Sequence, residues 1–219
     1  MSNNIKHHLT DALLTAYAAG TLPEAFDLVV ATHVSMCDEC RARLAEFEAL
    51  GGEVLEQMAT DEAPLDEGSL AATMALIADE SAAQPEARPV KAGSVFPGPL
   101  QAYAGADLDE VKWRRVGGGV SQKVLKTHGD ATVRLLRIPA GSKMPDHGHR
   151  GTELTLVLSG AFMDEDDIFA AGDIEVANEE LHHTPIAAEG EDCICLAATD
   201  APLRFKGLMP RIAQRMIGI

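Results

Sequence analysis

Three soft metal donors lie within eight positions of one another near the start of the chain. They are His33, Cys37 and Cys40, and the two cysteines follow the histidine by four and seven positions. On a helix, side chains at these offsets could share one face. Two thiolates and an imidazole suit tetrahedral zinc, which needs a fourth donor to close a structural site. His7 and His8, just ahead of the first predicted helix, are the candidates, and both stay open.

A pair of cysteines separated by two residues has other uses. It can be a redox dithiol or two buried, apolar side chains. A redox pair usually follows a strand in a βαβ unit, whereas the residues ahead of Cys37 have a helical pattern. Together with His33 and the upstream histidine pair, this context favours zinc.

A second group of donors lies in the other half of the chain. His147 and His149 share a face of an extended segment, Glu153 has the same parity, and His183 follows, with His182 as a competing neighbour. Such donors predict a metal site, although surface histidines in a hairpin are the plain alternative. Three histidines and one glutamate would saturate a tetrahedral zinc, giving a closed site for structure or sensing. Around iron or manganese the same ligands would leave positions open for substrate or dioxygen.

Two further cysteines, Cys193 and Cys195, lie two positions apart in an apolar segment and should face the same way. Most such thiols are simply packed. An oxidation or sensing role would require exposure and a lowered pKa.

The charge is concentrated in the first part of the 219-residue chain, whose net charge is −16. Residues 1–90 carry 16 acidic and 4 basic side chains, and residues 91–219 carry 18 and 14, giving −12 and −4. A domain at −12 repels nucleic acid and favours a basic partner, although an acidic surface is also common for solubility alone. No signal peptide is visible and no apolar run approaches the ~18 residues of a membrane span, so we expect a cytoplasmic protein.

Helical periodicity dominates the first part of the chain. Thr10 or Asp11 can cap a first helix that stops at Gly20, and Pro23 suits the first position of a second helix, whose apolar stripe ends at His33. After Cys40 an apolar seam continues through residues 44, 47, 54 and 58, weakened at Gly51-Gly52. A fourth helix is predicted from residue 69 to about 82, packing against the others or lying against a partner, with packing the expected arrangement. Because short helices bury little, a metal would supply the stability that the core lacks.

Residues 84–99 contain four prolines and two glycines, which predicts a linker. Beyond it the pattern alternates, predicting strands at residues 120–125, 131–138, 154–158, 173–177 and 192–197. The expected fold is therefore α+β with two domains: a zinc-clamped all-α domain at 1–83, and a β-sandwich or small barrel at 100–219.

The second group of donors resembles the first motif of the cupin family. The matching positions are Gly141, His147, His149, Glu153 and Gly160, and Gly172 and His183 match part of the second motif. In that second motif Asn178 and Glu180 replace the usual proline and glycine, and the terminal asparagine is missing.

Taken whole, the chain resembles the ChrR-type zinc-binding anti-sigma factors of proteobacteria. The similar segments are His7-His8 ahead of residues 11–17, residues 37–43, residues 145–151 and residues 192–205. The resemblance implies a cytoplasmic regulator, not an enzyme, that sequesters an extracytoplasmic-function sigma factor, in a 1:1 complex on the simplest expectation, without contacting nucleic acid or membrane. It implies zinc on His8, His33, Cys37 and Cys40, and a metal, expected to be zinc, on His147, His149, Glu153 and His183.

In this family the helical domain does the sequestering, and the cupin domain is implicated in responding to singlet oxygen and related oxidants. The −12 charge of residues 1–90 suits a basic, DNA-binding partner. The main alternative is a cupin metalloenzyme, a dioxygenase or isomerase, with an accessory zinc-helix module. A third hypothesis is a metal buffer or trafficking protein.

Overall fold

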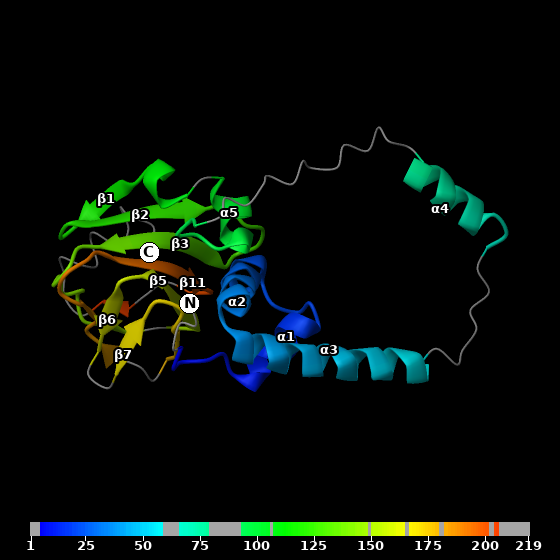
Figure 1. Cartoon of the computed structure of the whole chain (residues 1–219), viewed down its shortest axis with the longest axis horizontal. Helices are drawn as coiled ribbons and strands as arrows, with labels where there is room; N and C mark the ends of the chain where they lie inside the picture. The colour runs from blue at the N-terminus through cyan, green and yellow to red at the C-terminus, as the bar shows by residue number, and fades with distance from the viewer. Residues whose placement is uncertain are drawn as a thin grey trace.

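A computed structural model describes residues 5–58, 66–78, 93–105, 107–148, 150–164, 167–179, 182–201 and 204–205. Three helices at the start of the chain pack beside a β-rich unit, and a fourth helix stands apart from both (Figure 1). We call residues 5–58 the helical unit and residues 98–205 the β unit. The predicted α+β fold is confirmed.

The helical unit begins with two capped helices. α1 (Asp11–Ala18) has Thr10 as its cap, whose hydroxyl accepts a hydrogen bond from the Leu13 amide at 3.3 Å. Gly20 then turns the chain with a φ of +64°. α2 (Glu24–Met36) starts one residue later than the sequence suggested, because Pro23 is its extended cap. Apolar residues occur around most of α2, which is typical of a buried helix.

A helix break at Cys37 separates α2 from α3 (Asp38–Met58). Its φ of −110° and ψ of 108° are extended, so His33, Cys37 and Cys40 do not share one continuous helix as the sequence suggested. The break replaces the predicted common face with a corner between two helices.

α3 continues through Gly51-Gly52 without interruption, but its packed seam is short. Leu44 is buried, whereas Val54 and Met58 are exposed by 47% and 72%, so the predicted seam does not extend to them. α4 (Ser69–Ala78) carries exposed Leu70, Met74 and Ile77 and buries no residue, contrary to the expected packing. The remainder of that predicted helix, residues 79–82, lies outside the described residues.

The β unit consists of one large sheet and two small ones. The six-stranded sheet has the order β1-β2-β3-β11-β5-β8, and all its neighbouring strands are antiparallel. Its strands are β1 (Arg114–Gly117), β2 (Val120–Leu125), β3 (Thr132–Ile138), β11 (Cys193–Thr199), β5 (Glu153–Ser159) and β8 (Ile174–Ala177). All five predicted strands are present in this sheet.

The smaller sheets complete the β unit. One has the order β10-β6-β7 and the other β12-β4-β9. Their strands are β10 (Ile186–Ala187), β6 (Ala161–Met163), β7 (Ile168–Ala170), β12 (Arg204–Phe205), β4 (His147–Gly148) and β9 (His182–His183). Ahead of β1 lie α5 (Gly98–Ala104) and a 3-10 turn, η1 (Leu108–Glu110).

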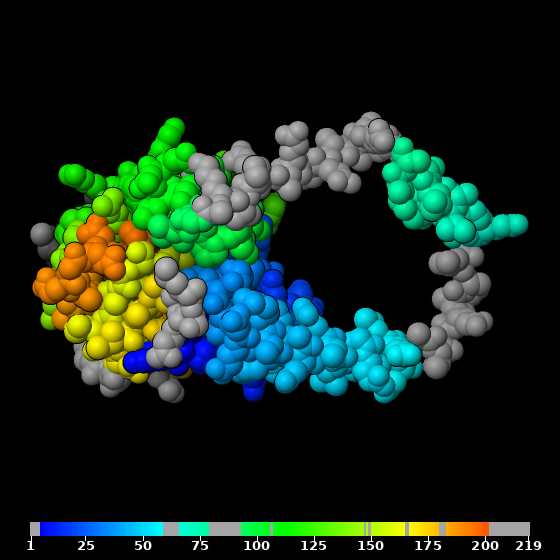
Figure 2. Space-filling model, viewed as in Figure 1, coloured from blue at the N-terminus to red at the C-terminus, as the bar shows by residue number. Residues whose placement is uncertain are grey.

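The helical unit and the β unit share one hydrophobic core. Leu14 and Val29 belong to the same buried cluster as Leu135, Leu156 and Leu196 of the large sheet. α2 packs against β11, β5, β3 and α5, and the surface view shows the helical unit seated on the β unit with α3 extending from it (Figure 2). The predicted linker at 84–99 lies mostly outside the described residues, but Phe96 within it is buried in this core.

A second core lies between the large sheet and the β10-β6-β7 sheet. It contains Val157, Phe162, Phe169, Cys193 and Cys195. Phe162 and Phe169 stack with ring centroids 4.9 Å apart. Within the described part of the chain, no helix is long and apolar enough to cross a membrane.

Candidate metal centres

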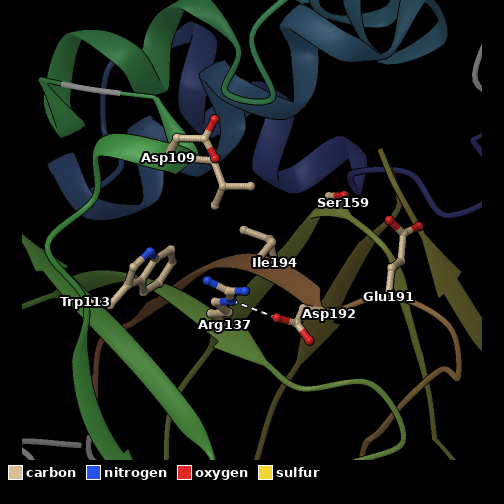
Figure 3. A pocket seen from close by; sticks show the side chains of 8 residues that line it. Asp109, Trp113, Arg137, Ser159, Glu191, Asp192 and Ile194 are labelled. Carbon is tan, nitrogen blue, oxygen red and sulfur yellow. Dashed lines mark hydrogen bonds and ion pairs between the residues drawn. The ribbon is translucent and has the colours of Figure 1, made fainter.

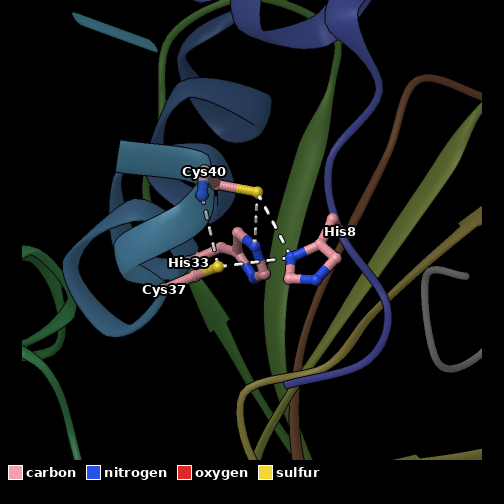
Figure 4. Close-up of side chains that lie close together, drawn as sticks. All are labelled: His8, His33, Cys37 and Cys40. Atoms are coloured by element: carbon pink, nitrogen blue, oxygen red, sulfur yellow. Dashed lines mark hydrogen bonds between the residues drawn. The ribbon is translucent and has the colours of Figure 1, made fainter. Parts of the chain in front are cut away.

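The four donors of the helical unit converge on one point. One ligand atom from each of His8, His33, Cys37 and Cys40 lies within 4.8 Å of all the others. The His33 Nε2–Cys40 Sγ and Cys37 Sγ–His8 Nδ1 distances are both 3.3 Å, and Cys40 Sγ lies 3.7 Å from His8 Nδ1 (Figure 4). Tetrahedral zinc with ordinary bond lengths separates a sulfur ligand from a nitrogen ligand by about 3.6 Å. The donor set and its spacing therefore fit a closed zinc site.

The helix corner places three of these donors. His33 lies in the last turn of α2, Cys37 at the break and Cys40 in the first turn of α3. The Cys40 amide donates to Cys37 Sγ at 3.4 Å, so the first turn of α3 directs an N–H at this sulfur.

The fourth donor comes from an extended segment, residues 5–9, which we call the amino-terminal strap. Its His8 presents Nδ1 to the cluster, while Nε2 lies 3.3 Å from Glu39 Oε2. A carboxylate on the second ring nitrogen is the usual way to orient a metal-bound histidine. His7 points elsewhere, with Nε2 2.9 Å from Asp167 Oδ2.

The electrostatics of this cluster suit a cation. Burial lowers the pKa of His33 to about 4, so its imidazole is neutral, as a ligand must be. Burial raises the pKa of Cys40 to about 11, so the thiolate needs compensating positive charge. A divalent ion supplies that charge, and the cluster can hold a metal ion.

The second predicted site is only partly described. Its His183 is buried, and β4 pairs with β9 so that His147 lies opposite His183. Glu153 begins β5 and accepts a hydrogen bond from Thr155 Oγ1 at 3.0 Å. His149 lies outside the described residues, and the ligand set His147, His149, Glu153 and His183 stays a prediction.

Two carboxylates that the sequence analysis missed lie beside His183. Glu175 Oε1 is 3.0 Å from His183 Nδ1, and Asp164 Oδ2 is 3.8 Å from the same nitrogen. These three residues form a second group whose donor atoms lie within 4.8 Å of one another. The available signal was Glu175 itself, an acid between apolar residues in the predicted strand at 173–177.

The buried acid and histidine influence each other. Burial raises the pKa of Glu175. Burial alone would lower the pKa of His183, but the Glu175 carboxylate, together with the charges of Glu153 and Asp164, outweighs burial and raises that pKa. Nitrogen and oxygen donors of this kind suit zinc, iron or manganese.

Cys193 and Cys195 face the same way, as predicted, with their sulfurs 3.4 Å apart. Both thiols are buried in the second core, and the pKa of Cys195 is raised well above its ordinary value by the Cys193 side chain and by burial. Low reactivity follows from such surroundings, which supports the packed interpretation.

A polar recess of about 370 Å³ lies on the β unit near η1 (Figure 3). Trp113, Arg137 and Asp192 contribute to its lining, and the Arg137 Nε–Asp192 Oδ2 distance is 2.7 Å. This ion pair engages the only cation among the lining residues. No residue of the recess was singled out from the sequence.

The fold and the first cluster define a two-part protein, in which a helical unit with a His₂Cys₂ cluster that can hold a metal ion is seated on a β unit. Residues 101–202 match the family model of the ChrR cupin-like domain. The chain is 58% identical over 210 residues, 96% of its length and 97% of the relative's, to the anti-sigma-E factor ChrR of Cereibacter sphaeroides. It therefore belongs to the ChrR family of anti-sigma factors, which confirms the resemblance.

Solved structures agree with this assignment. A crystal structure of Rhodobacter sphaeroides SigE in complex with the anti-sigma ChrR contains a 57% identical chain. The match covers 90% of this chain and all of that one, with a TM-score of 0.77. An RmlC-like cupin from Ralstonia eutropha is 27% identical over 46% of this chain and 70% of its own, with a TM-score of 0.42.

Proposed function

We propose that this chain is an anti-sigma factor that sequesters an extracytoplasmic-function sigma factor and so represses transcription. The observation that carries the proposal is the 57% identical chain whose crystal structure is a complex with SigE. Because the similar relative is a regulator, the proposal replaces the metalloenzyme alternative. The protein acts in the cytoplasm, in a 1:1 complex, without contacting DNA or membrane.

The surface of the helical region suits a protein partner. α3 exposes Leu50, Leu55 and Met58 by 62%, 72% and 72%, and α4 exposes Leu70 and Leu76 by 73% and 74%. Exposed apolar side chains at helical spacing mark a surface that binds another protein. The charge of −12 over residues 1–90 favours a basic partner such as a DNA-binding factor.

We assign residues 1–83 to sigma binding, 84–99 to a linker and 100–219 to a cupin domain that controls release. In the first domain a zinc ion on His8, His33, Cys37 and Cys40 holds the corner between α2 and α3. In the second, His147, His149, Glu153 and His183 hold a metal, proposed as zinc, and singlet oxygen or related oxidants trigger release. The assembled His₂Cys₂ cluster supports the first assignment.

The test is coexpression of the tagged chain with an extracytoplasmic-function sigma factor, followed by copurification and metal analysis. We expect a 1:1 complex with zinc in the helical unit. The double variant Cys37→Ser, Cys40→Ser should lose that zinc and at least 100-fold in sigma affinity, because structural zinc supplies folding free energy.

The matched control is Cys193→Ser, Cys195→Ser, which changes the same residue types in the β unit and should retain binding. Full sigma binding by the Cys37, Cys40 variant would contradict the proposed role of zinc. Absence of any complex with wild-type protein would contradict the function itself.

A further inference from the structure

A buried carboxylate of the β unit, Asp173, binds the backbone of the amino-terminal strap. Asp173 Oδ1 accepts hydrogen bonds from the backbone amides of Lys6 and His7 at 2.6 and 2.9 Å. These residues directly precede His8, the strap's donor to the metal cluster. Asp173 thus fixes the backbone from which His8 reaches the metal.

Asp173 is well suited to this role. It is only 2% exposed, and its second oxygen accepts from the Ala170 amide at 2.9 Å. Burial alone would raise its pKa, but the amides of Ala170, His7 and Lys6 outweigh this and lower it. The carboxylate is therefore ionised, and its charge strengthens each of these hydrogen bonds.

Other contacts hold the strap to the chain segment that runs from β7 through a turn into β8. The His7 ring lies against Phe169 of β7, with ring centroids 4.3 Å apart. The Ile174 amide at the start of β8 donates to the His7 carbonyl at 3.4 Å. The backbone of Gly172, in the turn between the two strands, partly opposes the lowering of the pKa of His33, a second donor of the cluster, by burial.

The same segment leads to the acid–histidine group of the β unit. Glu175 lies two residues after Asp173, and its Oε1 is 3.0 Å from His183 Nδ1. One short piece of chain therefore holds the backbone next to His8 through Asp173 and contacts His183 through Glu175. Asp173 directly precedes β8 and Glu175 is the second residue of β8, so a displacement of Glu175 moves Asp173 as well.

We propose that Asp173 is a positioning residue that couples the His₂Cys₂ cluster to the acid–histidine group of the β unit: it holds His8 on its metal while the acid–histidine group is intact, and releases it when that group is disturbed. This inference rests on the proposed metal site of the helical unit but not on sigma binding. Residues that orient metal ligands typically contribute 10- to 100-fold to metal affinity.

The test uses the free, full-length chain loaded with cobalt in place of zinc. Only the His₂Cys₂ site offers thiolates among the two proposed donor sets, so the thiolate-to-cobalt absorption band reports that site alone. We expect Asp173→Asn to release cobalt to excess EDTA at least tenfold faster than wild type. A rate within twofold of wild type would overturn the proposal.

A second pair of variants tests the hydrogen bond between Asp173 and the strap by changing its donor. Lys6→Pro removes the amide that donates at 2.6 Å, whereas its matched control Lys6→Ala keeps the amide and loses only an exposed side chain. We expect fast release from Lys6→Pro and wild-type release from Lys6→Ala. Equal rates for the two would contradict the role of the backbone clamp, even if Asp173→Asn proved unstable.

Coupling is tested by adding His183→Ala to each protein. On its own this change should speed cobalt release from the thiolate site, although His183 is not a donor of that site. In the Asp173→Asn background it should add less than twofold, because the connection is already broken. Additive effects, or no effect of His183→Ala on wild type, would overturn the coupling, and since sigma factor is absent these outcomes leave the proposed function intact.

Discussion

At the scale of single residues, the structure separates neighbours that the sequence left equivalent. His7 and His8 were equal candidates on spacing alone, yet His8 faces the cysteines and His7 faces Asp167. Their different roles depend on Asp173 and Phe169, more than 150 positions later in the chain. Sequence spacing contains no information about such distant contacts.

Glu24 provides a residue-scale prediction. This first residue of α2 accepts hydrogen bonds from the Tyr103 hydroxyl at 2.8 Å and from the backbone and ring of His128. These bonds lower its pKa from 4.5 to about 2, with the His128 amide contributing most. Between these two pH values the unfolded chain binds a proton that the folded chain does not.

The Glu24 contribution to stability is therefore complete above pH 4.5 and is lost as the pH falls towards 2. We expect Glu24→Gln to lower the melting temperature at pH 6, with the difference from wild type shrinking to nothing near pH 2. Calorimetry between pH 6 and pH 2 measures this difference in melting temperature. The control is Glu46→Gln, which changes an exposed acid on α3. A difference independent of pH would contradict this account.

At the scale of elements, the helices and strands followed well from local pattern. Thr10, Gly20 and the alternating segments mark their elements because caps, positive φ and sheet faces are local requirements. The break at Cys37 did not follow, since three donors at helical spacing fit either one helix or a corner. The exposure of α3 beyond Phe47 did not follow either, because an apolar stripe does not reveal whether it is covered from within or by a partner.

The glycine pair of α3 gives an element-scale prediction. A Cβ added at Gly51 or Gly52 would meet nothing within 4 Å. Alanine is favoured over glycine in a helix interior by about 1 kcal/mol, so each substitution should slow amide hydrogen exchange in residues 50–58 about fivefold.

Gly160→Ala is the contrasting change. Its φ is +70°, and an added Cβ would lie 2.7 Å from the Asp192 carbonyl oxygen, so this variant should lose stability. Unchanged exchange in Gly51→Ala and Gly52→Ala would mean that the distal part of α3 is already fully helical without them.

At the scale of the whole molecule, the helical unit and the β unit share a core. The sequence suggested two domains joined by a linker, and its boundaries at 83 and 99 stay a prediction. The apolar residues around α2 were the available signal that this helix is covered on several sides, but its partner surface on β5 and β11 is far away in sequence.

A shared core predicts a single cooperative unfolding transition for these two parts. Trp113, the only tryptophan of the chain, packs against the shared core, and the thiolate-to-cobalt band reports the helical unit. In urea, both signals should have the same midpoint. Leu156→Ala, a fully buried change in β5, should lower both midpoints together, at a cost of about 2–5 kcal/mol. Two separated transitions would show that the units unfold independently.

The length of α3 means that small movements at the corner between α2 and α3 are amplified at the far end of the helix. Its 21 residues span about 31 Å, and those beyond Phe47 are exposed within the part of the chain that the structure describes. A small rotation of α3 about Cys37 therefore produces a much larger displacement at Met58. For a protein bound to the distal end of α3, a sub-ångström rearrangement among the metal's ligands would therefore change the orientation of the surface to which it is bound.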